Sequence, residues 1–463
     1  KINEVIDNYS DNIYNTTINT KDVIYMTIEM ESLNETQISV TNNLCLKQNV
    51  NFSSKTLDTR RKNINNEIFL HLIEPLKNII IKELGLNCKI FAVDGSKLSL
   101  SLEMNKENYP TARPNTKMKK KLIEDVNLDY KNKIKVVRTT YNIIKKKSKN
   151  KNDIELEKQL KIKDLMDERK NKIKKIKKDE TLNNEQDYEL CEKSKAKYCK
   201  GLLTTIFDVT YELPLMMKTS KIMDERQHII DMINESNFIE KGSIIIFDGG
   251  YYSEELFNFL LSKGIIPIFR LKHDMNICEN LDKSNKEDDI VYIGNNEAKI
   301  IKYQKNKETF YILTSDTTLD NSKLEKLYWF RWAVEEFYKK LKHTMKGKFY
   351  NVSNDNIFKQ SIYAQQFASL YTRIMTIIAI KYNINLTKKR SSSISYVKRE
   401  TQINFKEALK ISIRELLNIK NNSISEVIFI LNRITNSTFP KIPGRTYKRI
   451  AIIFTGKWYF DGN

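Results

Sequence analysis

Short runs of consecutive apolar residues, bounded by turn residues, alternate along this chain with longer segments of helical periodicity. Two of these runs, 89–93 and 244–247, are typical of strands that are buried on both faces of a sheet. Each run leads into an aspartate, Asp94 or Asp248, and then into glycine, so we expect both strands to end there. A third run, 265–270, follows a segment with helical periodicity. This order predicts an α/β core.

One segment without proline or glycine, 327–346, has a strong helical pattern and is expected to form a single helix. Four polar side chains in it are 3, 4 and 7 residues apart: Tyr328, Arg331, Glu335 and Lys342. At 3.6 residues per turn these side chains share one face. Such a stripe is suited to holding a phosphodiester beside a metal ion. The alternative is a surface helix with an ion pair between Arg331 and Glu335.

The stripe resembles the signature of the insertion-sequence DDE transposases of the IS-four type. That signature is a tyrosine, two residues, an arginine, three residues, a glutamate, six residues and a lysine, and Trp332 after the arginine also fits. The segments around Asp94 and Asp248 are similar to the family's first and second aspartate motifs, the second by its Asp-Gly-Gly-Tyr-Tyr turn. The resemblance covers about residues 20–455 and implies a ribonuclease H-like mixed sheet flanked by helices.

The resemblance implies that Asp94, Asp248 and Glu335 are the catalytic carboxylates and hold two Mg²⁺ ions, for which Mn²⁺ would substitute. Carboxylate oxygens are the hard ligands that Mg²⁺ prefers. Two ions roughly 3.5–4 Å apart can stabilise both oxygens of an in-line displacement at phosphorus. Asp94 would be shared between the ions. Asp208, in the turn of an expected hairpin, is a weaker rival for the second carboxylate.

The charge balance favours a polyanionic partner. Lys+Arg number 79 and Asp+Glu 58, which gives a net charge of +21 and a pI of about 9.4. An AT-rich genome also produces lysine-rich chains, so the charge alone is weak support. The resemblance implies double-stranded DNA as the partner, at the terminal inverted repeats and the target, with Tyr328, Arg331 and Lys342 on phosphates near the transposon end.

The N-terminal region, residues 1–85, is expected to be helical. Two short helices precede a third that begins at about Ser54 and carries Arg60, Arg61 and Lys62. This order resembles a helix-turn-helix, so we predict that these three basic residues contact DNA. Short helices that serve only as structural filler are an equally good explanation.

The catalytic core is expected to be interrupted twice. Residues 110–197 are rich in lysine and predict a helical hairpin, either a basic arm that binds DNA or a solvated insertion. Residues 271–320 alternate between apolar and polar positions, which predicts antiparallel strands. The expected domains are 1–85, a helical DNA-binding domain; 86–109 and 198–270, the first part of the core; 110–197, the basic insertion; 271–320, the β-rich insertion; 321–385, the rest of the catalytic core, with the glutamate helix and the following helix and helical after Lys342 to about Lys381; and 386–463, helices with a basic tail.

The chain is expected to act inside the cell, with the DNA. Its five cysteines show no paired spacing, which indicates a reducing compartment. The longest apolar stretch, about 367–380, is interrupted by Arg373 and is too short to span a bilayer, and there is no signal peptide. We therefore expect neither membrane association nor secretion.

These observations predict a DDE transposase that hydrolyses DNA at the 3′ ends of a transposon and then joins them to target DNA. The resemblance implies a cut-and-paste route through a hairpin intermediate, and a homodimer in the synaptic complex. Two alternatives remain: a domesticated DNA-binding protein, and a ribonuclease H-like endonuclease without strand transfer. Base flipping onto Trp329 or Trp332 would suit the hairpin route, although core packing is the expected role of both.

Overall fold

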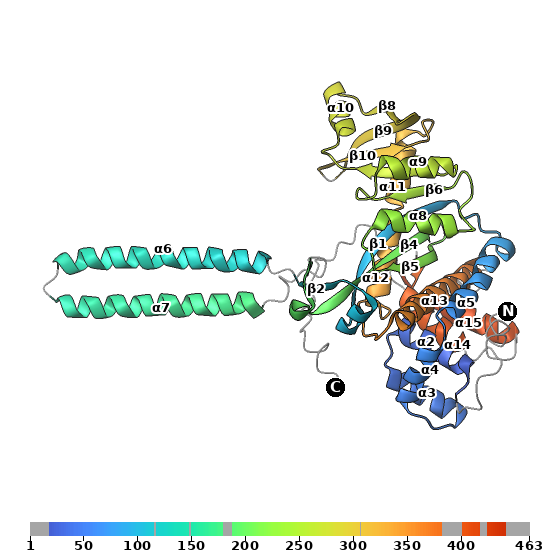
Figure 1. Cartoon of the computed structure of the whole chain (residues 1–463), viewed down its shortest axis with the longest axis horizontal. Helices are drawn as coiled ribbons and strands as arrows, with labels where there is room; N and C mark the ends of the chain where they lie inside the picture. The colour runs from blue at the N-terminus through green and yellow to red at the C-terminus, as the bar shows by residue number, and fades with distance from the viewer. Residues whose placement is uncertain are drawn as a thin grey trace, which may run out of the picture. The chain divides into compact units, whose positions relative to one another are not determined.

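The computed structural model describes residues 18–114, 117–147, 150–178, 188–305, 307–381, 401–416 and 424–440 (Figure 1). The chain forms two compact units, Lys1–Pro110 with Cys199–Pro443 and Thr111–Tyr198 with Gly444–Asn463. We call them the first and the second unit. The predicted basic tail that begins at Pro443 lies outside the described residues.

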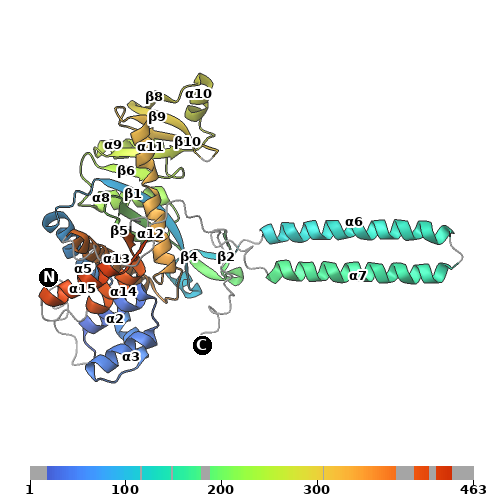
Figure 2. The ribbon, with the colours of Figure 1, turned by 180° about the vertical axis from the view of Figure 1, so that it is seen from behind.

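The first unit is built on a mixed sheet with the strand order β5-β4-β1-β6-β7-β10-β9-β8 (Figures 1 and 2). Strand β4 is antiparallel to both β1 and β5, whereas β6 is parallel to β1 and β7 is parallel to β6. Strand β10 then pairs antiparallel with β7, so the strands predicted for 271–320 extend the same sheet. The strands are β1 (Ile90–Leu100), β4 (Tyr198–Asp208), β5 (Leu213–Ser220), β6 (Ile244–Phe247), β7 (Ile266–Leu271), β8 (Asp288–Ile293), β9 (Asn296–Lys305), β10 (Glu308–Thr314) and β11 (Phe349–Tyr350).

Strand β1 does not end at Asp94 as predicted. It continues through Gly95 and Ser96 because β4 pairs with it from Phe91 to Leu100. Gly95 makes no turn. A side chain there would start 2.8 Å from the carboxyl carbon of Glu225, so the glycine admits that carboxylate against the strand.

Helices cover the sheet of the first unit. Some of them begin at a side-chain cap: the Ser253 hydroxyl accepts from the Leu256 N–H at 3.1 Å, and Asp224 caps α8 in the same way. The helices that follow β5 are α8 (Glu225–Glu235), α9 (Glu254–Ser262), α10 (Asn276–Ser284), α11 (Asn321–Trp329), α12 (Trp332–His343), α13 (Asp355–Lys381), α14 (Phe405–Leu416) and α15 (Ile424–Asn436), with β12 (Thr401–Ile403) and β13 (Thr438–Pro440) as a separate strand pair.

The sequence predicts that the chain stays helical from Lys342 to about Lys381, but the structure interrupts this helix. Helix α12 ends at His343, and β11 pairs with β1 before α13 begins. Gly347 allows this change of direction: a side chain there would start 2.6 Å from the carbonyl oxygen of Leu341.

Helix α13 is buried on nearly all sides and packs against α2, α5, α14, α15 and β5. Its buried positions include Gln365, Phe367 and Leu370. Several buried amide atoms find partners, such as Gln365 Oε1, which accepts from the Tyr350 hydroxyl at 2.7 Å. No helix in the described part of the chain is both long and apolar enough to cross a membrane.

Four helices form the described N-terminal part. They are α2 (Thr20–Leu33), α3 (Gln37–Gln48), α4 (Ser54–Asn63) and α5 (Glu67–Asn78), with a π-helical extension η1 (Ile79–Glu83). Helices α2, α3 and α4 surround a small core of their own that includes Val23, Met26, Val40 and Leu57. The other face of α2 packs into the main core, so these helices are continuous with the first unit.

Arg61 is not available to DNA as predicted. Its side chain is buried, with Nη2 3.3 Å from the Glu31 carboxylate, and it also donates to Gln360 and Ser361 of α13. The helical spacing turns Arg61 inward, whereas Lys62 stays outside and pairs with Asp58. Arg61 therefore joins α4 to the core.

The second unit contains a long antiparallel pair of helices, α6 (Lys117–Lys147) and α7 (Lys151–Lys178), in the region where the sequence predicts a helical hairpin (Figure 1). Tyr130 of α6 is fully buried in it, and Lys145 pairs with Glu155 at 2.6 Å. A short strand pair, β2 (Thr111–Pro114) and β3 (Tyr188–Leu190), completes the described part together with the turn η4 (Lys193–Lys195). The first unit has one further short helix, η2 (Leu102–Glu107).

Replacing Arg61 tests its structural role. We expect Arg61→Ala to lower the free energy of unfolding by about 3–5 kcal/mol, because Glu31 would be left buried without its partner. The exposed Lys62→Ala change should cost less than about 1 kcal/mol. Urea unfolding of the two variants measures both values. Equally small losses would contradict the buried ion pair.

Candidate active site

Asp94 and Asp248 lie next to each other at one edge of the parallel strands. The last residue pair of β1 and β6 is Ala92 with Ile246, and each aspartate lies two residues farther along its own strand direction. Side chains alternate along a strand, so both carboxylates face the same side of the sheet as Ala92 and Ile246. Ile246 belongs to a buried cluster with Tyr328 of α11, which therefore covers this side.

The segment 327–346 is not one helix. Helix α11 ends at Trp329 and α12 begins at Trp332, with Phe330 and Arg331 in a turn between them. The predicted common face is therefore interrupted, and Tyr328 and Arg331 are buried, with 2% and 6% of their surface exposed. Phe330 and Arg331 keep right-handed helical backbone angles, and the Arg331 N–H donates to the Tyr328 carbonyl oxygen three residues before it, so the interruption is a tight turn between the two helices.

Arg331 lies among the three carboxylates. Its Nη2 donates to Glu335 Oε1 at 2.6 Å, and its charge also interacts with Asp248 and Asp94. Burial alone would lower the pKa of Arg331, but Tyr328, Asp248 and Glu335 outweigh it and hold the pKa above its ordinary value. The guanidinium is thus fully charged and offsets the repulsion between the acids.

The carboxyl group of Asp94 has a raised pKa. Burial raises the pKa of its carboxyl from 3.8 to about 7; Arg331 and the Gly95 N–H lower it, and Asp248 and Glu335 raise it further. An acid with this pKa holds a proton at mild acidity. A cation bound nearby would favour the ionised form of this carboxyl.

The remaining members of the predicted stripe lie around this group. The Tyr328 hydroxyl is 3.4 Å from Asp248 Oδ1, and Lys342 is half-buried two turns after Glu335 on the same face of α12. The tryptophans differ: Trp329 packs beside Tyr328 in the core, as predicted for both, whereas Trp332 is 45% exposed.

Three carboxylates suit Mg²⁺ by their chemistry, because it binds oxygen ligands and keeps several waters. Among the described residues, however, no group of three or more His, Cys, Asp or Glu side chains is arranged to hold one ion. Each ion would therefore be held by two carboxylates, with Arg331 between them displaced from Glu335. The Nε of Arg331 is buried and has no hydrogen-bond partner in the described part, so an incoming acceptor would satisfy it.

Three functional candidates were missed by sequence reasoning. The Tyr338 hydroxyl donates to the Asp94 carbonyl oxygen at 2.7 Å and lies 3.0 Å from the Thr205 hydroxyl, which ties α12 to β1. Arg270 of β7 packs over Phe310 and its charge interacts with Tyr328. Glu225 places its carboxylate against Gly95. Of the three, only Arg270 could have been recognised from the sequence, because it is a basic residue near the end of a predicted buried strand.

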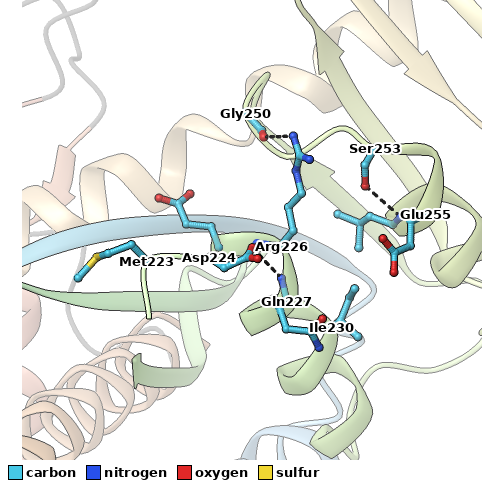
Figure 3. A pocket seen from close by; sticks show the side chains of 10 residues that line it. Met223, Asp224, Arg226, Gln227, Ile230, Gly250, Ser253 and Glu255 are labelled. Atoms are coloured by element: carbon cyan, nitrogen blue, oxygen red, sulfur yellow. Dashed lines mark hydrogen bonds between the residues drawn. The ribbon is translucent and has the colours of Figure 1, made fainter. Parts of the chain in front are cut away.

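A cavity of about 700 Å³ lies beside the turn that follows Asp248 (Figure 3). Its walls come from the starts of α8 and α9, and Arg226 crosses it to donate to the Gly250 carbonyl oxygen at 3.1 Å. Three carboxylates line it, those of Asp224, Glu225 and Glu255, so it is a poor place for a phosphate.

The rival Asp208 lies elsewhere. It pairs with Phe91, three residues before Asp94 along β1, which is about 10 Å away in an extended strand. Its Oδ1 accepts from the Tyr211 N–H at 2.7 Å in the hairpin turn, and burial raises the pKa of its carboxyl to about 6. Its position is that of a turn residue.

Comparison with models of protein families gives a match. Residues 174–371 match the family model described as "Transposase DDE domain", a range that includes Asp248, Arg331 and Glu335 and begins after Asp94. No curated protein matches the chain. The match supports a DDE transposase, an enzyme that acts on DNA.

The raised pKa of Asp94 predicts a dependence of stability on pH. Between about pH 4 and 7 the native state keeps a proton that the unfolded chain releases, so native stability falls as pH rises through this window. The Asp94→Asn variant has no carboxyl group at this position, so its native stability does not fall in this way as pH rises. Without metal, the variant should gain roughly 1–3 kcal/mol relative to wild type between pH 5 and pH 8 in urea unfolding. The exposed Glu336→Gln change is the control, and a gain independent of pH would contradict the prediction.

Proposed function

We propose that this chain is a DDE transposase that hydrolyses DNA at transposon ends and transfers the freed 3′ ends to target DNA. The observation that carries the proposal is the meeting of Asp94, Asp248 and Glu335, from three separate segments, around Arg331. The family match to residues 174–371 supports it independently.

The sheet supports a ribonuclease H-like core. A hairpin of antiparallel strands lies on one side of β1 and the parallel strands β6 and β7 lie on the other. The helix with Glu335 follows these strands in sequence and packs on β1. This is the succession of strand, hairpin, helix, strand, helix, strand and glutamate helix that the resemblance implies.

The three carboxylates would hold two Mg²⁺ or Mn²⁺ ions, Asp94 binding both, Asp248 one and Glu335 the other. When bound, such ions activate the attacking oxygen and stabilise the leaving oxygen of the phosphodiester. Asp94 must lose its proton before it binds an ion, which its pKa of about 7 allows near neutral pH.

Arg331 would bind the phosphate at the cleavage position. Once the carboxylates are neutralised, its guanidinium can leave Glu335 and offer Nε and Nη2 together, and such a pair of donors suits a phosphate. Tyr328, Lys342 and Arg270 would bind flanking phosphates. Binding of this kind aligns the substrate for in-line attack.

The wider properties follow from the resemblance. They are a cut-and-paste route through a hairpin intermediate, a homodimer that joins two transposon ends, and action inside the cell, with the DNA. The exposed Trp332, beside Arg331, is the better placed of the two tryptophans to stack on a flipped base. Arg60 and Lys62 of α4 remain candidates for end recognition, without Arg61.

The decisive test compares wild type with Glu335→Gln on DNA that carries the element's own ends, with Mg²⁺ or Mn²⁺. We expect nicking and joining by wild type, and a loss of about a hundredfold or more in the variant with DNA affinity retained. The neighbouring Glu336→Gln change, on an exposed side chain, should keep full activity.

Equal activity in all three proteins would refute the site. Nicking without joining would identify an endonuclease, and tight end binding without cleavage in any of them would identify a domesticated DNA-binding protein.

Tyr338 should act as a positioning residue. Tyr338→Phe removes the hydroxyl that fixes the Asp94 backbone to α12, so we expect turnover to fall by about 10- to 100-fold while DNA affinity stays within about twofold. Tyr350→Phe, which loses a buried hydrogen bond to Gln365, is the matched control and should retain turnover. If both variants lose turnover equally, the effect is one of stability and not of positioning.

A further inference from the structure

Most of the net positive charge belongs to the two long helices of the second unit. Helices α6 and α7, 31 and 28 residues long, contain 22 Lys and Arg against 9 Asp and Glu. The excess of 13 is more than half of the chain's +21. This charge is not needed to build the active site, because Asp94, Asp248 and Glu335 all lie in the first unit.

The seam between the helices defines two faces of the hairpin. Tyr130, Ile134 and Val137 of α6 recur at spacings of 4 and 3 and are less exposed than their neighbours, as are Ile162 and Leu165 of α7. Such spacing marks the contact stripe of a packed helix pair. The other residues lie on one or the other side of this stripe.

The basic side chains of α6 gather on one side of the seam. At 100° per residue, five of them fall within an arc of about 100°: Lys121, Lys131, Lys135, Arg138 and Lys146. All five are exposed. Glu124 is the one acid of α6 in this arc.

Helix α7 adds to the same face. Lys163, Lys170 and Lys174 lie within an arc of about 40° and are exposed. In an antiparallel pair, residues offset from the seam in the same rotational sense on both helices lie on one face. This offset is shared by the α6 and α7 sets, which together form what we call the basic face. None of its eight basic side chains pairs with a carboxylate among the described residues.

The opposite face has a different character. A groove of about 700 Å³ runs along it between the helices. Its charged lining is mixed: Asp129, Lys133, Lys161, Asp164 and Glu168. Lys133 pairs with Asp129 at 2.8 Å. The positive excess is therefore not spread around the hairpin but concentrated on the basic face.

We propose that the basic face is a second DNA-binding surface, which contacts the phosphates of duplex DNA without reading its sequence. From Lys121 to Lys146 the face is about 38 Å long, close to one turn of B-DNA. Duplex DNA carries one negative charge per roughly 1.7 Å, so a row of unpaired cations of this length meets many phosphates. Lysine and arginine on a straight helix pair bind these by charge.

The choice of DNA over another polyanion rests on the proposed function. A second copy of the chain is a less suitable occupant, because two basic faces repel each other and the groove side has too little net negative charge to attract one. The surface would hold DNA outside the cleavage position, either the flank of the transposon or the target.

The test uses the full chain and a 30-base-pair duplex without any transposon sequence. The basic-face variant changes Lys131, Lys135, Arg138 and Lys170 to glutamine, which keeps helix propensity while it removes four charges. The control removes the same charge from the groove side: Lys133, Lys161, Lys172 and Lys175 to glutamine. Fluorescence anisotropy measures affinity between 50 and 200 mM salt, and circular dichroism verifies that helicity is retained.

We expect the slope of log K against log salt to become shallower by about 3–4 for the basic-face variant, at about 0.9 per lost phosphate contact, and by less than about 1 for the control. Affinity at 100 mM salt should fall at least about tenfold in the first variant only. Equal changes in both variants would show that only the net charge of the hairpin matters, and not the basic face, which would contradict the proposal. Unchanged slopes, or a changed oligomeric state in sedimentation, would also overturn it.

The two proposals fail separately. If wild type binds the duplex through the basic face but cleaves no end DNA, the transposase proposal fails and the binding surface stands. If end DNA is cleaved while the slopes are unchanged, only the binding surface is refuted.

Discussion

The site depends on one constraint: three carboxylates share a partly buried edge of a sheet, and one arginine offsets their repulsion. Burial makes this arrangement costly, as the raised pKa of Asp94 shows. Arg331 keeps its full charge in the same place and binds Glu335. The substrate complex that we propose would require the opposite arrangement, with cations on the acids and the arginine on a phosphate. In the folded chain, the Arg331 side chain thus supplies the positive charge that bound cations would supply in the complex.

The surrounding fold keeps that edge in register. Pairing with β4 along its whole length holds β1 straight past Asp94, while the shorter β6 ends just before Asp248 and leaves the edge open. Helix α12 is attached to β1 through the Tyr338 hydroxyl, one turn from Glu335. The position of Glu335 relative to Asp94 therefore depends on the hydrogen bond from the Tyr338 hydroxyl to the Asp94 backbone, in which neither carboxylate takes part.

The sequence predicted the elements whose signal is local. The predicted run 244–247 matches β6 to the residue. The predicted end of β1 was wrong. Gly95 and Ser96 are of the types that often form turns, but pairing with β4, more than a hundred residues away in sequence, keeps them extended. The interruption before Trp332 could not be predicted, because the sequence has no glycine or proline there. Arg61 looked like a DNA contact because sequence shows a charge but not the buried Glu31 that receives it.

The point at which the hairpin enters the chain has a consequence for folding. Leu100 and Cys199 are paired neighbours in the sheet, yet 98 residues separate them in sequence. Closing a loop of that length is a slow, non-local event, although its free-energy cost grows only with the logarithm of length. Helices α6 and α7 can pair with each other early, since their contacts are local. Once paired, they bring the chain back close to where it left, which shortens the effective loop and speeds the strand pairing on which the first acid depends.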